Sequence, residues 1–236
     1  MGVLNWTSEH ARGEHALLKR LLSTFTEGVV LDVGANEGEY TQFLLGLDAP
    51  LTIHAFEPHP RTFARLCDRM RGTGVACHNF AAGSEVGDIQ LFDYADADGS
   101  SHASVYEGVI ENIHKRPAVV HRVKSIRLDK FLAERGISRV VLLKIDTEGA
   151  ELEVLKGLSG FLDDPKSSIQ YIQLEFNEMN VMSRVFFKDI LERLPGYRAY
   201  RILPRGRVVD ITDEDVLSKE LFAYQNLLLS RSPLRP

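Results

Sequence analysis

The sequence predicts a doubly wound α/β fold built on a mostly parallel sheet of seven strands, with the last strand antiparallel. Short apolar runs rich in β-branched residues recur along the chain, and the first two are each followed by a helical pattern. Acidic residues directly follow several of these runs. This alternation is typical of strand-helix-strand units, in which helices cover both faces of a parallel sheet.

The apolar runs that predict the core strands lie at residues 29–33, 51–56, 75–80, 139–145, 169–176, 197–203 and 221–230. Two more runs, at 89–94 and 119–127, predict strands that pair at the edge of the sheet or over its end. Helices are expected where apolar residues recur every three or four positions. The first begins near Trp6 with Ser8 as its N-cap, and the others lie at 40–47, 60–70, 129–135, 150–158 and 186–194.

All 236 residues are expected to form one domain, with residues 1–27 as an N-terminal helical extension, because no linker or repeat divides the chain. The formal charge of -5 argues against nucleic acid as a partner, since phosphate binding needs a concentrated basic face. No apolar run is long enough to cross a membrane, and Met1 to Arg12 lacks the apolar core of a signal peptide. The two cysteines, Cys67 and Cys77, lack metal-ligand spacing. We therefore expect a cytoplasmic protein without membrane insertion, and leave its oligomeric state open.

A glycine-bracketed turn follows the first predicted strand, with Asp32, Gly34 and Gly38 at its fixed positions. Glycines let the backbone turn sharply and approach a ligand closely. A dinucleotide fingerprint needs a second glycine for its pyrophosphate, and Asn36 stands at that position. An acidic residue two positions before the first glycine instead suits a ligand with a cationic amine, such as S-adenosylmethionine. The alternative is a purely structural turn in which Asp32 acts as a cap.

Glu57 ends the second predicted strand, where doubly wound folds place an acid that accepts both ribose hydroxyls. The third strand leads into Ala81 and Ala82, small residues against which a flat adenine can lie. In the segment at 96–104 the apolar residues show neither helical nor strand periodicity, which is typical of a lid or of a mobile loop. It gives His102 only a slight preference as a substrate-facing residue.

The stretch from Lys144 to Glu151 is unusually charged for the end of a buried strand. Side chains alternate along a strand, so Lys144 and Asp146 face the same side. Lys144 is expected to pair with Asp146 or Glu175, either as a structural ion pair or as part of the chemistry. Right-handed crossovers would gather five strand-end residues along one edge of the sheet. These are Asp32, Glu57, Ala82, Asp146 and Glu175.

Three blocks of the sequence, at 32–38, 56–60 and 143–157, resemble those of the FkbM family of S-adenosylmethionine-dependent methyltransferases. The resemblance covers roughly residues 28–200. It implies a class I methyltransferase, Rossmann-like fold and O-methylation of a hydroxyl on a sugar, glycolipid or polyketide-type metabolite. It places the cofactor on Asp32, Gly34, Asn36, Gly38 and Glu57. With the neighbouring turn residues and the adenine segment, the expected cofactor site adds Ala35, Pro58, Ala81, Ala82 and Asp146.

Methyl transfer to an alkyl hydroxyl requires alignment of three atoms and a group that accepts one proton. Asp146 is the first candidate for base or acceptor orienter and Glu175 the second, with Lys144 positioning one of them. Clustered carboxylates could instead hold Mg²⁺, but no dense ligand pattern supports this and we predict no metal. Two alternatives remain, an NAD-dependent oxidoreductase on a Rossmann-like fold and a non-catalytic nucleoside-binding module.

Overall fold

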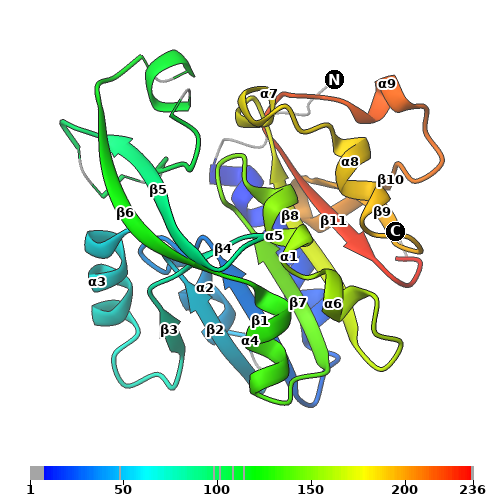
Figure 1. Cartoon of the computed structure of the whole chain (residues 1–236). Helices are drawn as coiled ribbons and strands as arrows, with labels where there is room; N and C mark the ends of the chain where they lie inside the picture. The colour runs from blue at the N-terminus through cyan, green and yellow to red at the C-terminus, as the bar shows by residue number, and fades with distance from the viewer. Residues whose placement is uncertain are drawn as a thin grey trace.

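A computed structural model describes residues 8–47, 49–97, 99–100, 102–107, 109–113 and 115–234, with side chains from residue 13 onward (Figure 1). The described part of the first predicted helix is α1 (Ser8–Leu22). Trp6 and the expected cap side chain of Ser8 lie outside the described part of the chain. Among the described residues, no helix combines the length and the apolar character needed to cross a bilayer.

The core of the protein is one sheet of eight strands in the order β10-β9-β11-β8-β7-β1-β2-β3. Its parallel part runs from β8 through β7, β1 and β2 to β3. The last strand, β11, lies antiparallel to both β8 and β9, as predicted. The strands are β1 (Gly28–Val33), β2 (Leu51–Phe56), β3 (Ala76–His78), β7 (Arg139–Ile145), β8 (Ser168–Phe176), β9 (Arg198–Leu203), β10 (Arg207–Asp210) and β11 (Gln225–Ser230).

The doubly wound fold class is confirmed, and the sheet has one strand more than the seven predicted. The additional strand, β10, follows β9 through the short 3-10 turn η2 (Pro204–Gly206) and pairs with it antiparallel. Val208 and Val209 are its two apolar residues, too few for a recognisable period. This edge strand therefore forms because it pairs with β9 in a hairpin, and no apolar pattern in the sequence predicts it.

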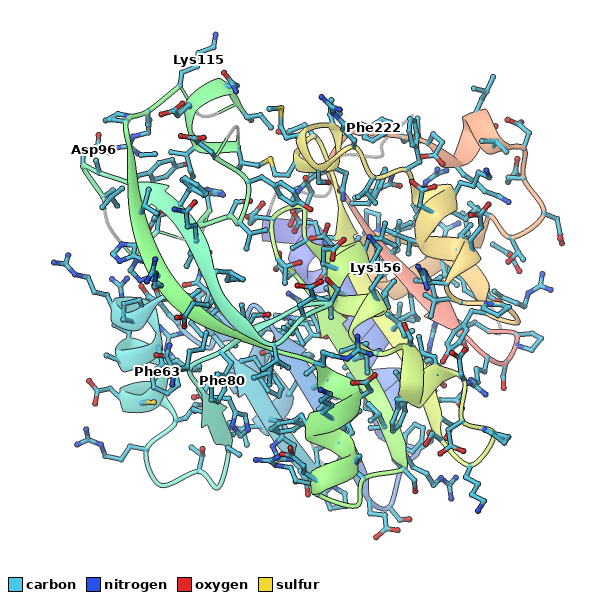
Figure 2. All side chains as sticks on the ribbon, in the orientation of Figure 1. Phe63, Phe80, Asp96, Lys115, Lys156 and Phe222 are labelled. Carbon is cyan, nitrogen blue, oxygen red and sulfur yellow. The ribbon has the colours of Figure 1, made fainter. Side chains whose placement is uncertain are left out.

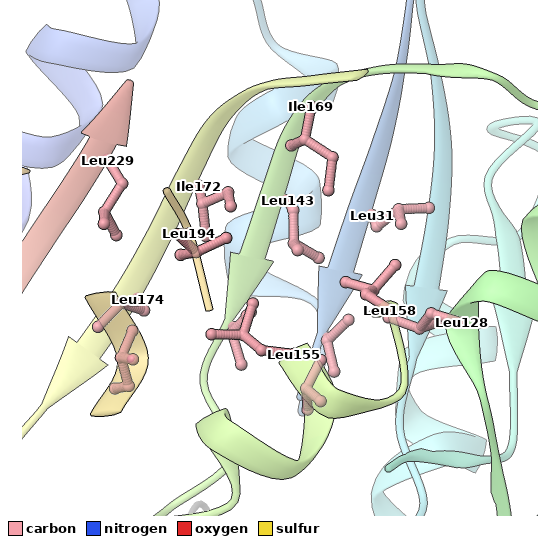
Figure 3. Packing of buried hydrophobic residues seen from close by; sticks show 14 of the residues in the cluster. Leu31, Leu128, Leu143, Leu155, Leu158, Ile169, Ile172, Leu174, Leu194 and Leu229 are labelled. Carbon is pink, nitrogen blue, oxygen red and sulfur yellow. The ribbon is translucent and has the colours of Figure 1, made fainter. Parts of the chain in front are cut away.

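Helices cover both faces of the sheet, and each face has its own apolar core. On one face α1, α2 (Glu39–Leu45) and α3 (Pro60–Arg69) pack over residues such as Val30 and Ala55. On the other face Leu31, Leu143 and Ile172 contact the second group of helices (Figure 3). These are α4 (Leu128–Glu134), α5 (Glu151–Lys156), α6 (Ser159–Leu162) and α8 (Phe187–Glu192).

Strand alternation decides which face receives the charged residues of the core strands. Leu31 and Val33 of β1 belong to the core on the α4 side, so Asp32 faces α1 and α2. Lys144 is the register partner of Asp32 on β7 and faces the same way. Two opposite charges are thus buried side by side beneath the carboxyl ends of the central strands.

A second, three-stranded sheet in the order β4-β6-β5 accounts for the additional strand pair predicted from the sequence. β5 (Gly87–Tyr94) and β6 (Ala118–Ile126) form an antiparallel hairpin, and the two-residue β4 (Ala81–Ala82) runs parallel to β6. In Figure 1 the hairpin rises to one side of the carboxyl ends of the central strands. Asp96 and Lys115 lie at its far end (Figure 2).

Three short helical segments surround the carboxyl-end face of the sheet and were not predicted. They are the π-helix η1 (Val109–Ile113), α7 (Met179–Ser183) and α9 (Val216–Lys219). Val109, Ile110 and Met179 pack together with Phe92 and Tyr94 of β5. This small apolar cluster joins the hairpin to the segment after β8.

The core on the α4 side predicts a large cost for truncating Leu158, which is 0% exposed and packs beside Leu128 and Leu155 (Figure 3). Leu158→Ala should lower the free energy of unfolding by about 2–5 kcal/mol, since it removes buried methyl groups and leaves a cavity. Urea unfolding measures this. The matched control Leu217→Ala, at a side chain that is 83% exposed, should change stability by less than about 0.5 kcal/mol. Equal effects of the two substitutions would contradict this packing.

Candidate active site

A cavity of about 400 Å³ opens where the carboxyl ends of β1, β2, β7 and β8 meet. It contains eight of the residues predicted from the sequence to form the site. One wall holds Gly34, Asn36, Glu57 and Pro58, together with Ala81 and Ala82. Asp146 and Glu175 lie in the part formed by β7 and β8.

A second cavity, of about 930 Å³, adjoins the first and shares Gly34, Asn36 and Asp146 with it. Ala35 and Lys144 line this second cavity, so the two cavities together contain all but two of the predicted residues. The exceptions are Asp32 and Gly38.

The N-terminal helix forms part of the second cavity through Glu14 and His15. The Glu14 carboxylate accepts hydrogen bonds from the side-chain amides of Gln173, at 2.8 Å, and Asn226. Burial raises the pKa of Glu14 to about 7 despite the opposing charge of Lys144. The helical extension is therefore tied to the core strands at the site itself.

The glycine turn is locked against the end of β7. The amides of Gly34 and Ala35 donate to the Phe56 carbonyl at 3.0 and 2.9 Å, and Asp146 N donates to the Val33 carbonyl at 3.0 Å. Gly34 has φ +80°, and a Cβ there would lie 1.7 Å from the Asp146 carbonyl oxygen. Glycine is required at this position by both conformation and space.

Asp32 and Gly38 support this turn from behind. Asp32 is 0% exposed, and its Oδ2 accepts a hydrogen bond from the Thr41 hydroxyl at 2.5 Å. Burial raises the pKa of Asp32 against the opposing effect of Lys144. Gly38 has φ +84°, and a Cβ there would lie 2.6 Å from Leu66.

Glu57 lies in the cavity wall with both carboxylate oxygens already hydrogen-bonded. Oε2 accepts from Asn36 N at 2.9 Å and Oε1 from His59 N at 2.8 Å. Because a carboxylate can accept about four hydrogen bonds, each oxygen keeps capacity for a ligand hydroxyl. Burial raises the pKa of Glu57 to about 7, although these backbone hydrogen bonds oppose the shift.

Lys144 pairs with Asp146, which settles the choice that the sequence left open. Its Nζ lies 2.6 Å from Asp146 Oδ2 and 4.9 Å from the centre of the Tyr40 ring. Burial alone would lower the pKa of Lys144, but Coulombic attraction by Asp146 and Asp32 outweighs burial and holds the pKa above its usual value. The ammonium group therefore stays charged beneath the floor of the site.

Three carboxylates, those of Asp146, Glu148 and Glu175, come within 4.8 Å of one another. Burial, with repulsion from Asp146 and Glu148, raises the pKa of Glu175 well above its usual value. A shared proton or a cation can relieve such crowding, and the Lys144 ammonium already neutralises Asp146. The expectation that the site holds no metal stays a prediction.

His102 and Glu148 also line the site; the sequence assigned His102 only a slight preference as a substrate-facing residue and placed Glu148 among the charged residues after β7 without a role. His102 lines both cavities, and its Nδ1 lies 3.4 Å from Glu148 Oε1. The charged block after β7 was a signal for Glu148, whereas nothing in the aperiodic segment around His102 marked it. Tyr224, which also lines both cavities, precedes β11 without any motif.

The fold and the site together define a class of protein. A parallel sheet with a glycine turn that lacks the pyrophosphate glycine, an acid after β2 and carboxylates after β7 and in β8 are the features of a class I methyltransferase. A family model described as the methyltransferase FkbM domain matches residues 32–202. The chain belongs to this family, which confirms the resemblance seen in its sequence and makes S-adenosylmethionine its cofactor.

Two curated relatives illustrate the family. The chain is 30% identical to the hexuronic acid methyltransferase AglP of Haloferax volcanii over 73% of its length, and the match spans 66% of that protein. It is 27% identical to the 2-O-methyltransferase NoeI of Sinorhizobium fredii, over 78% of this chain and 77% of the relative. About a third of the first relative's length therefore lies outside the match.

Solved structures agree on the fold. The fibrillarin pre-rRNA processing protein of Methanococcus jannaschii superposes with a TM-score of 0.50 at 11% identity, over 97% of this chain and 78% of that one. At this identity the likeness concerns the fold alone.

The buried ion pair predicts that Lys144→Met is strongly destabilising, by about 3–5 kcal/mol at neutral pH, because it leaves Asp146 and Asp32 without their counter-charge. The loss should shrink as pH falls, since burial already raises the pKa of Asp32 in the folded state, removal of Lys144 takes away the charge that opposes this shift, and protonation then favours folding. Urea unfolding at several pH values measures both effects. The control Lys188→Met removes an exposed pair with Glu192 and should cost less than about 1 kcal/mol. A loss in Lys144→Met that is independent of pH would argue against the pairing.

Proposed function

We propose that this protein transfers the methyl group of S-adenosylmethionine to a hydroxyl oxygen of a small carbohydrate acceptor. The observation that carries the proposal is the single cavity that joins a nucleoside-type end, at Glu57 and Ala82, to the carboxylates of Asp146 and Glu175. The relatives act on a hexuronic acid and at a 2-oxygen, as their names state, and support a sugar hydroxyl as the acceptor class. Polyketide-type metabolites are the other acceptor class for which the family resemblance allows.

The residues present fit the cofactor. Glu57 would accept the ribose hydroxyls, while Ala81 and Ala82 offer a flat apolar surface of a kind that suits adenine. The methionine end would extend along the turn at Gly34 to Asn36, toward the second cavity. Ala35 and Pro58 are assigned to the same two turns, and Asp32 supports the first of them from below.

The bound cofactor supplies an activated methyl group, so the protein has to position the acceptor and handle one proton. Asp146 is assigned to the acceptor hydroxyl, as base or as orienter, with Lys144 fixing its position at 2.6 Å. Glu175 is the second candidate. Because its pKa is raised well above the usual value, Glu175 also suits a role as a protonated hydrogen-bond donor.

Two competing functions differ in what binds. An NAD-dependent oxidoreductase requires room for a pyrophosphate at the glycine turn, where Asn36 stands with φ +49°. A non-catalytic nucleoside-binding module would bind the cofactor without turnover, and would leave the acidic cluster after β7 and in β8 without a role. Both are tested by the measurements below.

The formal charge of -5 supports the further proposal that nucleic acid is not the acceptor. Cys67 and Cys77 are both free, which is consistent with a reducing compartment such as the cytoplasm.

Calorimetric titration is expected to show binding of S-adenosylmethionine and S-adenosylhomocysteine, and none of NAD. Glu57→Ala should weaken binding by roughly 1.5–3 kcal/mol for each lost charge-assisted hydrogen bond. Wild-type affinity should also fall as pH drops below about 7, because protonation of Glu57 removes the acceptor that the ribose hydroxyls need. Glu134→Ala, at a side chain that is 74% exposed, is the control. Tighter binding of NAD than of S-adenosylhomocysteine would reject the methyltransferase assignment.

Transfer of a labelled methyl group to methyl glycosides of hexuronic acids and neutral hexoses tests the chemistry. Asp146→Asn should reduce turnover by about a hundred-fold to ten-thousand-fold if the carboxylate acts as the base, with a much smaller change in cofactor affinity. Weaker cofactor binding with turnover preserved at saturation would place Asp146 at the methionine amine instead. The turnover of Glu175→Gln, measured in parallel, tests whether Glu175 acts as the base instead. Asp163→Asn, at an exposed position outside the cavities, is the control.

A further inference from the structure

We propose that His102 is the base that receives the acceptor's proton, and that Glu148 is the residue that positions its imidazole ring. The inference rests on the proposed methyl transfer and assigns the proton to a residue outside the sequence-based candidates. It leaves Asp146 the role of orienting the acceptor hydroxyl.

The imidazole ring of His102 lies in the wall of the active-site cavity. His102 lines the same cavity as Glu57 and Asp146, and its side chain is 44% exposed. Nδ1 lies 3.4 Å from Glu148 Oε1, an arrangement that favours the tautomer with its proton on Nδ1. In that tautomer Nε2 is the nitrogen with a lone pair for a proton from the acceptor.

The backbone before His102 is held by a buried carboxylate. Asp93 is 0% exposed and accepts hydrogen bonds from Gly99 N at 2.7 Å and Ser100 N at 2.9 Å. The Ser100 hydroxyl also donates to Asp93 and accepts from His102 N at 3.1 Å. The segment is thus anchored to β5 just before the histidine.

The backbone after His102 is held as firmly. Ser104, also 0% exposed, exchanges two backbone hydrogen bonds with Phe92 at 2.7 and 2.9 Å. Its hydroxyl donates to the Glu148 carbonyl oxygen at 2.8 Å. This contact connects the segment that carries His102 to the turn that carries Glu148, so ring and carboxylate are positioned by the same set of bonds.

Glu148 is a buried carboxylate that a charged histidine beside it would stabilise. Oε2 is buried and has no hydrogen-bond partner among the described residues, and the side chain is 12% exposed. Buried carboxylate oxygens without partners are costly and call for a functional explanation. Protonation of His102 places a positive charge beside this carboxylate and stabilises it.

The competing carboxylates are less suited to receive a proton. Asp146 is neutralised by Lys144 at 2.6 Å, and Glu175 is crowded by two further carboxylates because burial and repulsion from Asp146 and Glu148 raise its pKa well above the usual value. The hydrogen bond to Glu148 raises the pKa of His102, burial opposes the shift, and Asp146 and Asp93 add to it. Tyr94, whose ring centre is 6.1 Å from that of His102, is a further titratable neighbour. Histidine is the side chain whose ordinary pKa lies nearest to neutral pH, which suits it to act as a general base.

The proposed step balances. A lone pair of the acceptor oxygen forms the new bond to the methyl carbon while the bond between that carbon and sulfur breaks. The electron pair of the broken bond stays on sulfur, which thereby loses its positive charge. The hydroxyl proton passes to His102 Nε2. The resulting imidazolium pairs with Glu148 and later releases the proton to water.

The first test needs no acceptor. Nitrogen-detected titration of the histidine rings, in protein saturated with S-adenosylhomocysteine, should show His102 with a pKa above 6.5 and the Nδ1–H tautomer. Glu148→Gln should shift this pKa downward and leave His121 unchanged. An ordinary pKa for His102 that does not respond to Glu148→Gln would overturn the pairing and the proposal with it.

The second test uses the methyl glycoside of glucuronic acid as acceptor. His102→Gln should lower turnover by about a hundred-fold or more, abolish the rise of kcat with pH through the His102 titration, and leave S-adenosylhomocysteine affinity unchanged. Free imidazole should restore part of the turnover of His102→Ala. His121→Gln, outside both cavities, is the matched control. Near-normal kcat in His102→Gln, or a loss without imidazole rescue, would overturn the proposal.

Failure of the proposed function would have a different signature. Wild-type protein would then transfer no methyl group to any acceptor of the panel, or would fail to bind S-adenosylhomocysteine. In either case His102 would have no acceptor proton to receive. A folded His102 variant that binds S-adenosylhomocysteine normally, beside an active wild type, separates the two outcomes.

Discussion

The buried ammonium group of Lys144 is the constraint on which the site depends. Acidic side chains gather at the carboxyl ends of β1, β7 and β8, and buried carboxylates are stable only when they are paired or protonated. Lys144 lies between Asp32, its register partner on β1, and Asp146, with which it pairs directly. Strand register therefore places positive charge beneath a crevice that otherwise carries negative charge.

The same ammonium connects the site to elements far apart in the chain. It lies over the ring of Tyr40 in α2, whose hydroxyl donates to Gln173 of β8 at 2.8 Å. The side-chain amide of Gln173 donates in turn to Glu14 of α1. Two helices and three strands thus share one polar cluster on the α1 face of the sheet, which explains why the N-terminal helix belongs to the site.

The sequence predicts most of this arrangement because its signals are local. Apolar β-branched runs mark the central strands, Gly34 marks the turn, and Glu57 and Asp146 directly follow strands that meet at one edge. What it could not predict depends on distant contacts. β10 has two apolar residues and forms through its pairing with β9, and the position of His102 is set only when β5, Ser104 and Glu148 hold its segment in place. Glu14 lies on the polar side of an amphipathic helix, and no motif in the surrounding sequence indicates that it lines a cavity.

The three-stranded sheet leaves the core and returns to it at nearly the same point. Ala81 and Ala82 pair with Ser125 and Ile126, and Gly83 N donates to the Ile126 carbonyl at 2.9 Å. The hairpin, which contributes Leu91 to the cavity lining, is thus a module with adjoining ends, closed by a few backbone hydrogen bonds. Such a module can change in length or sequence between family members without altering the register of the eight-stranded sheet. A change in this hairpin would therefore alter one part of the cavity lining and leave the turns at Gly34 and Glu57 in place.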